Sequence, residues 1–283
     1  MTKAKEQRQK VEKEELTREA LELLRSPRIF AHYLDIVRRS GLVGEECNAA
    51  VLNIAGISRL LGRPLNVIVK GPSSSGKNFL VNRALLPFPR SSIREITSSS
   101  ALAWNYASDD FRHRIVYLQE RNEASGAVHP ARLLISEGKL VRVVTVNEGG
   151  VRTTKRFVAK GPIASISTTT KNQLEVDDET RHVSIWVDES REQTKRIVLA
   201  HSLSAKLVTK HELKVWRTAH ELIEARAAAQ VALPTWFRRI ADSVYDGDVR
   251  VRRYYPAFVS ACMAVSLLRS FQKESGGRDE EED

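Results

Sequence analysis

Residues Gly71–Asn78 read Gly-Pro-Ser-Ser-Ser-Gly-Lys-Asn, and this stretch decides the fold. It follows Leu65–Lys70, which has the apolar pattern of a buried strand, and it opens Lys77–Leu86, which has the pattern of a helix. In the order strand, glycine-rich loop, helix, the motif G-x-x-x-x-G-K binds phosphate, because backbone N–H groups and the helix N-terminus converge on the anion. We therefore expect nucleotide phosphates to be bound by Gly71, Pro72, Ser73, Ser74, Ser75, Gly76, Lys77 and Asn78.

Two residues of this loop have separate expected roles. Lys77 is expected to reach the β- and γ-phosphates and to act in catalysis. Asn78 stands where a serine or threonine hydroxyl ordinarily ligates Mg²⁺, so its amide oxygen is a neutral substitute. We expect weaker metal affinity, with nucleotide binding through the backbone retained. The competing interpretation, a surface loop that ends in Gly-Lys by chance, does not account for the flanking strand and helix.

A second apolar strand, Arg114–Leu118, ends in Gln119-Glu120. An enzyme that hydrolyses a triphosphate needs an acidic residue at such a strand end, and Glu120 is our candidate for activating water. Gln119 takes the metal-ligand position without a charge, so Mg²⁺ is predicted to meet Asn78 and Gln119 through an amide oxygen or through water. Two neutral ligands predict slow hydrolysis, or hydrolysis that depends on assembly. A solvated acid at the end of a strand is the alternative for Glu120.

Strand and helix patterns alternate along the middle of the chain, where Ser98–Ser100 predict the cap of a helix that runs through Tyr106. Helical patterns follow from Arg191, among them an apolar helix over Pro256–Phe271. Between two strand patterns, Asn147–Gly150 predicts a hairpin turn. The sequence predicts an α/β fold: a mainly parallel sheet flanked by helices, with an inserted β-hairpin and a C-terminal helical region. The predicted divisions are an N-terminal helical extension (1–45), a core (46–200), a lid-like helical region (201–275) and an acidic tail (276–283).

Composition narrows the class of protein. The chain has 283 residues, 42% of them hydrophobic, and a formal net charge of +10, although its last five residues are all acidic. A basic body suits a polyanionic partner, although many proteins are basic without one. Its longest apolar runs fall short of the roughly 20 residues that a membrane span requires. Cys47 and Cys262 lie far apart, so we expect no disulfide framework, no zinc module and a cytoplasmic protein.

The order of these motifs resembles the AAA+ ATPase cores of mobile-element replication helicases. That branch inserts a β-hairpin before its sensor strand, as minichromosome-maintenance and superfamily III helicases do. The resemblance covers roughly residues 24–269, and only its phosphate loop is specific. The remaining motifs are Gln119-Glu120, the hairpin, Gly161–Thr169, Glu179-Thr180-Arg181 and Asp188–Thr194.

The resemblance implies several further roles. ATP and Mg²⁺ would be the cofactors, and the chain would form a homo-oligomer, a hexameric ring or a filament. One of Thr168 and Thr169 would be the sensor that contacts the γ-phosphate or the attacking water. Arg181 would be an arginine finger that enters the neighbouring subunit's site, although an arginine before a strand is often only an ion-pair former. A second sensor arginine would be Arg250, Arg252 or Arg253, and Arg252 is our choice.

The hairpin suggests a DNA contact. In a ring it would project into the channel and present Arg142, Arg152, Lys155 and Arg156 to phosphates, although Glu148 at its tip has the wrong sign. An ordinary solvated ribbon is the alternative. Trp104 and Tyr106 could stack on bases, but buried aromatic residues are commoner. The helicases that the chain resembles carry further domains that do not fit in 283 residues, so we expect either a partner protein that supplies substrate contacts or a stand-alone ATPase subunit.

Three functions remain open at this stage. The first is an ATP-hydrolysing helicase-like or DNA-remodelling motor of a mobile element. The second is a nucleotide-dependent assembly switch, such as a regulator of defence or transposition, with slow turnover. The neutral pair Asn78 and Gln119 favours the switch, whereas the hairpin and the basic charge favour the motor. A small-molecule kinase is the third, and the motifs after residue 160 argue against it.

Overall fold

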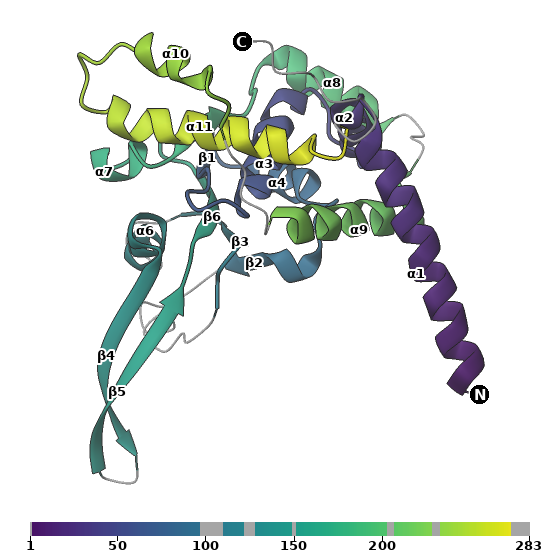
Figure 1. Cartoon of the computed structure of the whole chain (residues 1–283). Coiled ribbons are helices and arrows are strands. Elements are labelled where there is room, and N and C mark those ends of the chain that lie inside the picture. The colour runs from purple at the N-terminus through teal and green to yellow at the C-terminus, as the bar shows by residue number, and fades with distance from the viewer. Residues whose placement is uncertain are drawn as a thin grey trace.

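The computed structural model describes residues 2–96, 110–121, 128–148, 151–202, 207–227 and 233–272 (Figure 1). Its strands are β1 (Val67–Lys70), β2 (Ile93–Ile96), β3 (Arg114–Leu118), β4 (Lys139–Glu148), β5 (Val151–Lys160), β6 (Ile163–Thr169) and β7 (Val183–Trp186). Its helices are α1 (Thr2–Arg25), α2 (Ile29–Arg39), α3 (Glu46–Ser58), α4 (Lys77–Ala84), η1 (Arg90–Ser92), α6 (Val128–Glu137), α7 (Val176–Glu179), α8 (Arg191–His201), α9 (Lys210–Ala227), α10 (Phe237–Asp242) and α11 (Val251–Leu268).

Five strands form the central sheet in the order β2-β3-β6-β1-β7, and every neighbouring pair is parallel. Because parallel strands end at the same edge, the residues that follow β1, β3 and β6 meet at one carboxyl edge of the sheet. This confirms the predicted α/β fold: a parallel sheet flanked by helices, with an inserted hairpin and C-terminal helices.

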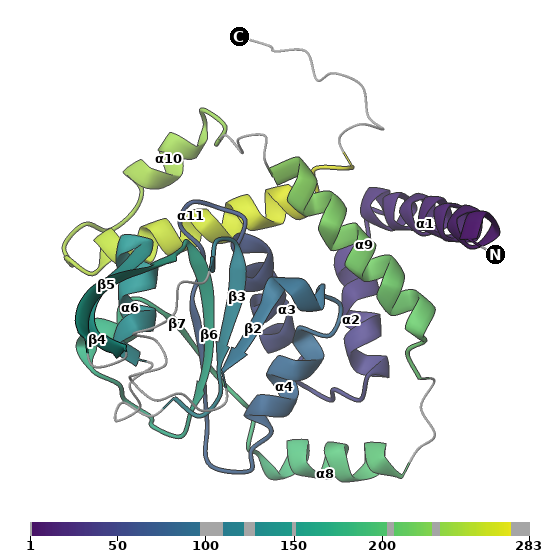
Figure 2. The same cartoon turned by 90° about the horizontal axis from the view of Figure 1, so that it is seen from below.

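The central strands β1, β3 and β6 are buried on both faces, as their apolar sequences require, whereas the edge strands β2 and β7 are partly exposed. In β3, Ile115 and Tyr117 belong to the larger core, which also takes in residues of α2, α3, α4, α9 and α11. Val116 and Leu118 face the other way and pack with Leu134 of α6. Figure 2 shows α3 and α4 on one side of the sheet and α6 on the other.

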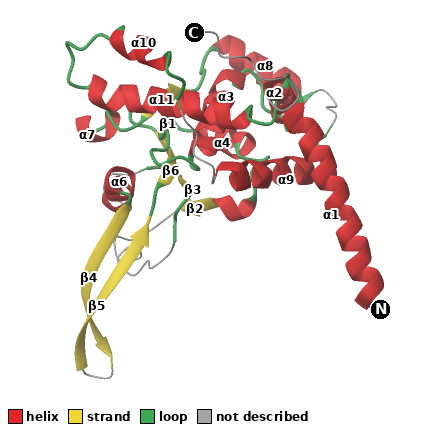
Figure 3. Cartoon of the chain, in the orientation of Figure 1, coloured by secondary structure: helices red, strands yellow, loops and turns green. Residues whose placement is uncertain are grey.

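Strands β4 and β5 pair only with each other and form an antiparallel hairpin between α6 and β6. Each strand has ten residues, so the hairpin is about 33 Å long. It leaves the body of the molecule as a separate arm, and the N-terminal half of α1 projects as a second one (Figure 3). The predicted hairpin is therefore confirmed, and along the chain it comes directly before β6, the strand that contains Thr168.

Most predicted elements appear within a few residues of their expected bounds, and two differ instructively. A helix starting at Pro256 was expected, but α11 begins at Val251 and holds Pro256 inside its second turn. Asp248 explains the earlier start, because its carboxylate accepts from the Arg250 N–H at 2.8 Å and its carbonyl accepts from the Val251 N–H. The four-residue helix α7 was not predicted. The helix expected near residues 98–106 lies outside the described residues.

None of the helices in the described ranges combines the length and the apolar character that crossing a membrane would demand.

Candidate nucleotide site

The loop Gly71–Asn78 lies at the carboxyl edge of the sheet, between β1 and α4. Gly71 has φ +152°, and a Cβ there would lie 2.5 Å from a methyl group of Val187, so the close approach of the two segments requires glycine. Gly76, with φ +87°, is the residue that caps α4. Ser74 is also left-handed, with φ 64°. Successive turns of this kind point backbone N–H groups into one concavity, which suits an anion.

Lys77 is buried at the start of α4. Its ammonium donates to the carbonyl of Gly71 at 2.9 Å and also to the carbonyl of Pro72. Burial lowers the pKa of Lys77, and the nearby Glu120 carboxylate acts in the opposite direction. The ammonium is therefore folded back onto its own loop, where a phosphate could replace the two carbonyls as its partner.

Asn78, Tyr117 and Thr168 form a hydrogen-bonded cluster beside the loop. The Oδ1 atom of Asn78 accepts from the Tyr117 hydroxyl at 3.1 Å and from Thr168 Oγ1 at 2.9 Å. Thr168 is fully buried, and its Oγ1 accepts in turn from the Glu120 N–H at 2.9 Å. Of the two threonines considered as the sensor, Thr168 is thus the one that contacts both nucleotide motifs: the phosphate-loop motif through Asn78 and the Gln119-Glu120 motif through Glu120. Thr169 Oγ1 instead accepts from the Lys171 N–H.

Glu120 follows β3 with an exposed side chain and a left-handed backbone, at φ 48°. Its neighbour Gln119 donates through Nε2 to the Glu95 carboxylate at the end of β2. Burial raises the pKa of Tyr117, and the negative charges of Glu95 and Glu120 raise it further. The sequence analysis missed Glu95 and Tyr117, because neither stands in a recognisable motif.

These residues fit Mg²⁺ only in part. Within the described chain no cluster of three or more histidine, cysteine, aspartate or glutamate residues could hold a metal. The amide oxygen of Asn78, expected to be a ligand, already accepts two hydroxyl hydrogen bonds. Mg²⁺ bound with a nucleotide usually keeps several waters and takes one or two carboxylates. Glu95 and Glu120 are the carboxylates beside these motifs, whereas Asn78 and Gln119 offer neutral amides.

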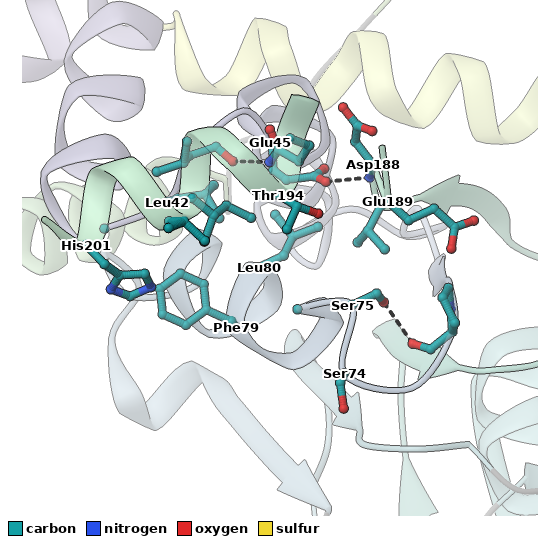
Figure 4. A pocket seen from close by; sticks show the side chains of 18 of the residues that line it. Leu42, Glu45, Ser74, Ser75, Phe79, Leu80, Asp188, Glu189, Thr194 and His201 are labelled. Atoms are coloured by element: carbon teal, nitrogen blue, oxygen red, sulfur yellow. Dashed lines mark hydrogen bonds between the residues drawn. The ribbon is translucent and has the colours of Figure 1, made fainter. Parts of the chain in front are cut away.

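A cavity of about 510 Å³ opens beside the loop, and the sequence analysis had not predicted it. Figure 4 shows it between the loop, the segment before α3 and helix α8. The Glu45 carboxylate accepts from the Asp188 N–H at 2.7 Å, and Gln193 donates to the carbonyl of Val43, so two walls are tied together. Apolar side chains dominate the remaining lining, which includes Leu42, Val43, Phe79, Leu80, Val187, Ile197 and Val198.

The arginines that were expected to meet nucleotide lie elsewhere. Arg181 precedes β7, at the amino edge of the sheet, and Arg252 lies near it in a groove of about 630 Å³. Strand β1 separates this edge from the loop by about 13 Å. Arg181 donates to Ser136 Oγ at 2.9 Å and pairs with Asp177 at 3.2 Å. Within one chain, therefore, both arginines lie at the opposite edge of the sheet from the phosphate loop.

The other two arginines considered for the second sensor are also engaged locally. Arg250 pairs with Asp248, and Arg253 donates to Thr180 Oγ1 and faces Asp177. On the hairpin, the described basic side chains include Arg142, Arg152, Lys155 and Arg156. Trp104 and Tyr106 fall outside the described residues.

Comparisons with known proteins add a similarity of fold. No family model matches the chain, and no curated protein matches it. Among solved structures, one similar chain is the crystal structure of a "putative ATPase" from Cytophaga hutchinsonii. It is 12% identical, with a TM-score of 0.49, and the similarity covers 92% of this chain and 83% of that one.

Proposed function

We propose that this protein binds and hydrolyses ATP together with Mg²⁺. The observation that carries the proposal is the convergence of the phosphate loop, Glu120 and Thr168 at one edge of the sheet, linked through Asn78. Lys77 would exchange its two carbonyl partners for phosphate oxygens, and Glu120 would orient the attacking water. The adjacent apolar cavity is large enough for a nucleoside. Bound Mg²⁺ would neutralise charge on the phosphates.

The second part of the proposal is assembly into a homo-oligomer, a hexameric ring or a filament. Arg181 and Arg252 line the amino edge of the sheet, away from the phosphate loop of their own chain. Both could serve a nucleotide only if that nucleotide were bound to a neighbouring subunit. A guanidinium supplied in this way offsets charge on the transferred phosphoryl group.

The third part is action on DNA, as a helicase-like or remodelling motor. It is supported by the net charge of +10 and by a basic arm that projects from the body. Exposed cations at the surface of such an arm can displace the counterions of a phosphate backbone. A partner protein could provide further substrate contacts.

A nucleotide-dependent assembly switch is the second candidate, and a specific observation favours it. The neutral amide oxygen of Asn78 already accepts from Tyr117 and Thr168, and the Glu95 carboxylate is already bonded to Gln119, so these groups are engaged with one another rather than free for Mg²⁺. Slow turnover follows from weak metal binding. ATP occupancy would then govern partner recruitment rather than power movement.

ATP turnover per subunit, measured against protein concentration with and without single-stranded or duplex DNA, tests both candidates. Wild type is expected to show turnover that rises with concentration. Lys77→Ala should lose nucleotide binding, and Glu120→Gln should bind but not hydrolyse. Arg181→Ala should hydrolyse poorly, yet regain activity when mixed with Lys77→Ala, because each chain supplies what the other lacks.

The outcomes separate the proposals. Concentration-independent turnover without rescue in the mixture removes the trans role of Arg181. If DNA changes neither the ATP turnover nor the assembly of the protein, the helicase-like motor is rejected in favour of the nucleotide-dependent assembly switch. If calorimetry detects no association of wild type with ATP at millimolar concentration, the nucleotide site itself is wrong.

A further inference from the structure

The short helix α7 carries three consecutive acids, Asp177, Asp178 and Glu179, and Arg181 follows two residues later. Two of these acids form ion pairs with residues that adjoin the nucleotide motifs. Asp178 pairs with Arg121, the residue after Glu120. Glu179 pairs with Lys70, the residue before Gly71.

The pair Arg121–Asp178 is removed from solvent. Its two atoms are 2.6 Å apart, and the side chains are 2% and 0% exposed. The backbone of Arg121 is held as well, since its N–H donates to the carbonyl of Thr168 at 2.7 Å. Burial alone would raise the pKa of Asp178, but Arg132 and Arg121 outweigh it, so the carboxylate stays charged. The position of the Glu120 backbone is therefore tied to α7 through the next residue.

The pair Lys70–Glu179 does the same for the phosphate loop. The ammonium of Lys70 lies 2.6 Å from one oxygen of Glu179 and 2.8 Å from the other, and its side chain is only 1% exposed. It also donates to the carbonyl of Asn172 and lies 5.0 Å from the ring centre of Trp186. Lys70 is thereby fixed at the point where β1 becomes the loop.

The third acid holds the other end of the segment. Asp177 pairs with Arg181 at 3.2 Å and faces Arg253 at 3.6 Å. If a phosphate bound to a neighbouring subunit drew Arg181 away from Asp177, the displacement would act on a helix of only four residues. Breaking either pair would leave the buried cation, Arg121 or Lys70, without its carboxylate, which is costly, so α7 and its partners are expected to move together.

We propose that α7 is a relay that couples Arg181 to the nucleotide site of its own chain, through Asp178 and Arg121 to Glu120 and through Glu179 and Lys70 to the phosphate loop. This inference rests on the proposed ATPase function and deepens it. Arg121 and Lys70 are positioning residues, because each acts through the segment beside it. The two branches make different predictions: the first governs hydrolysis, and the second governs nucleotide affinity.

Two single substitutions separate the branches. Arg121→Met should lower kcat by about 10- to 100-fold, because Glu120 loses its orientation, and should leave the Kd for ATP within about twofold. Glu179→Gln should weaken ATP binding by about tenfold, because it frees Lys70 beside the loop. Arg121→Lys, which keeps the charge, should recover much of the lost turnover. Turnover and a titration with fluorescent ATP provide the two readouts.

The matched control uses the other partner of the same carboxylate. Arg132 on α6 pairs with Asp178 at 2.6 Å but adjoins neither nucleotide motif. Arg132→Met should therefore lower thermal stability, as Arg121→Met does, while keeping kcat near that of wild type. An equal loss of turnover in Arg121→Met and Arg132→Met would mean that the ion pairs of Asp178 only stabilise the fold, and it would overturn the relay.

Amide hydrogen exchange tests the relay through α7 in the absence of nucleotide. In Arg121→Met, amide exchange should rise about tenfold at Glu120 and Arg121, whose N–H groups bond to Thr168. In Glu179→Gln it should rise instead at Val187, whose N–H bonds to the carbonyl of Lys70. Equal increases in both segments, or none, would contradict the relay even if ATP binds. Arg181→Ala should raise exchange at these same amides, and no change there would overturn the relay. If wild type binds no ATP but this whole exchange pattern holds, the coupling stands and the proposed ATPase function fails.

Discussion

At the scale of single residues, the hydroxyl of Thr168 is the link between the two nucleotide motifs. It donates to Asn78 in the helix after the phosphate loop and accepts from the N–H of Glu120. We expect Thr168→Val to destabilise the fold by about 1–3 kcal/mol, because the fully buried hydroxyl is lost, the Glu120 N–H loses its acceptor and the Asn78 oxygen keeps only Tyr117 as a donor. Turnover should fall with it. Urea unfolding and steady-state ATP hydrolysis measure the two effects.

Two neighbouring variants serve as controls. Thr168→Ser keeps the hydroxyl and should retain most of the stability and turnover. Thr169→Val removes a hydroxyl that serves only the Lys171 N–H among the described contacts, so its turnover should stay near wild type. If Thr169→Val proves the more damaging of the two valine variants, the sensor assignment belongs to Thr169.

The residues of the phosphate loop could be predicted from sequence because their chemistry is local. Gly71, Gly76 and Lys77 act through backbone geometry that eight consecutive residues encode. The engagement of Asn78 could not be predicted, since its partners lie 39 and 90 residues further along the chain. Only the pairing of β1 with β6 and of β6 with β3 brings them together.

At the scale of elements, the hairpin arm allows a direct test of the DNA proposal. Arg152 and Arg156 have exposed side chains on β5. If both contact phosphates, the double variant Arg152→Ala/Arg156→Ala should lower the salt dependence of DNA binding, with a slope of log K against log salt that is smaller by about 1.4–1.8. Fluorescence anisotropy at several salt concentrations measures it.

The control removes the same charge from the other projecting arm. Lys5→Ala/Lys10→Ala changes two exposed lysines on α1 and should leave the slope unaltered. Equal slopes for both double variants would show that only net charge matters, and the hairpin would be an ordinary solvated ribbon.

The elements also show which structural features a sequence pattern predicts and which it misses. The hairpin was predictable, because Asn147–Gly150 separates two long strand patterns. Helix α7 was not, because four residues are too few to show a helical period and its stability comes from ion pairs to Lys70 and Arg121. The early start of α11 was missed because proline was taken as a boundary, whereas the Asp248 turn sets it.

At the scale of the whole molecule, helix α9 is tied to the core by a buried histidine. His220 is 2% exposed and stacks on Phe88, with ring centres 3.9 Å apart. Nearby, Arg59 pairs with Glu224 of the same helix. Burial, with a further contribution from the charge of Arg59, lowers the pKa of His220 from 6.5 to about 3. The native state therefore holds this imidazole neutral across the whole mildly acidic range.

This makes global stability depend on pH with a definite sign. Below pH 6.5, His220 is protonated in the unfolded chain but stays neutral in the native state. The free energy of unfolding therefore falls as the pH falls from 6.5 toward 3. Each pH unit in that window costs about 1.4 kcal/mol for this one group. His220→Phe keeps an aromatic ring against Phe88 and removes the titration. We expect wild type to lose about 2 kcal/mol more than His220→Phe between pH 7 and pH 5, measured by urea unfolding. Parallel pH profiles for the two proteins would mean that the histidine is accessible to protons in the native state, and that α9 is not held against Phe88 as described.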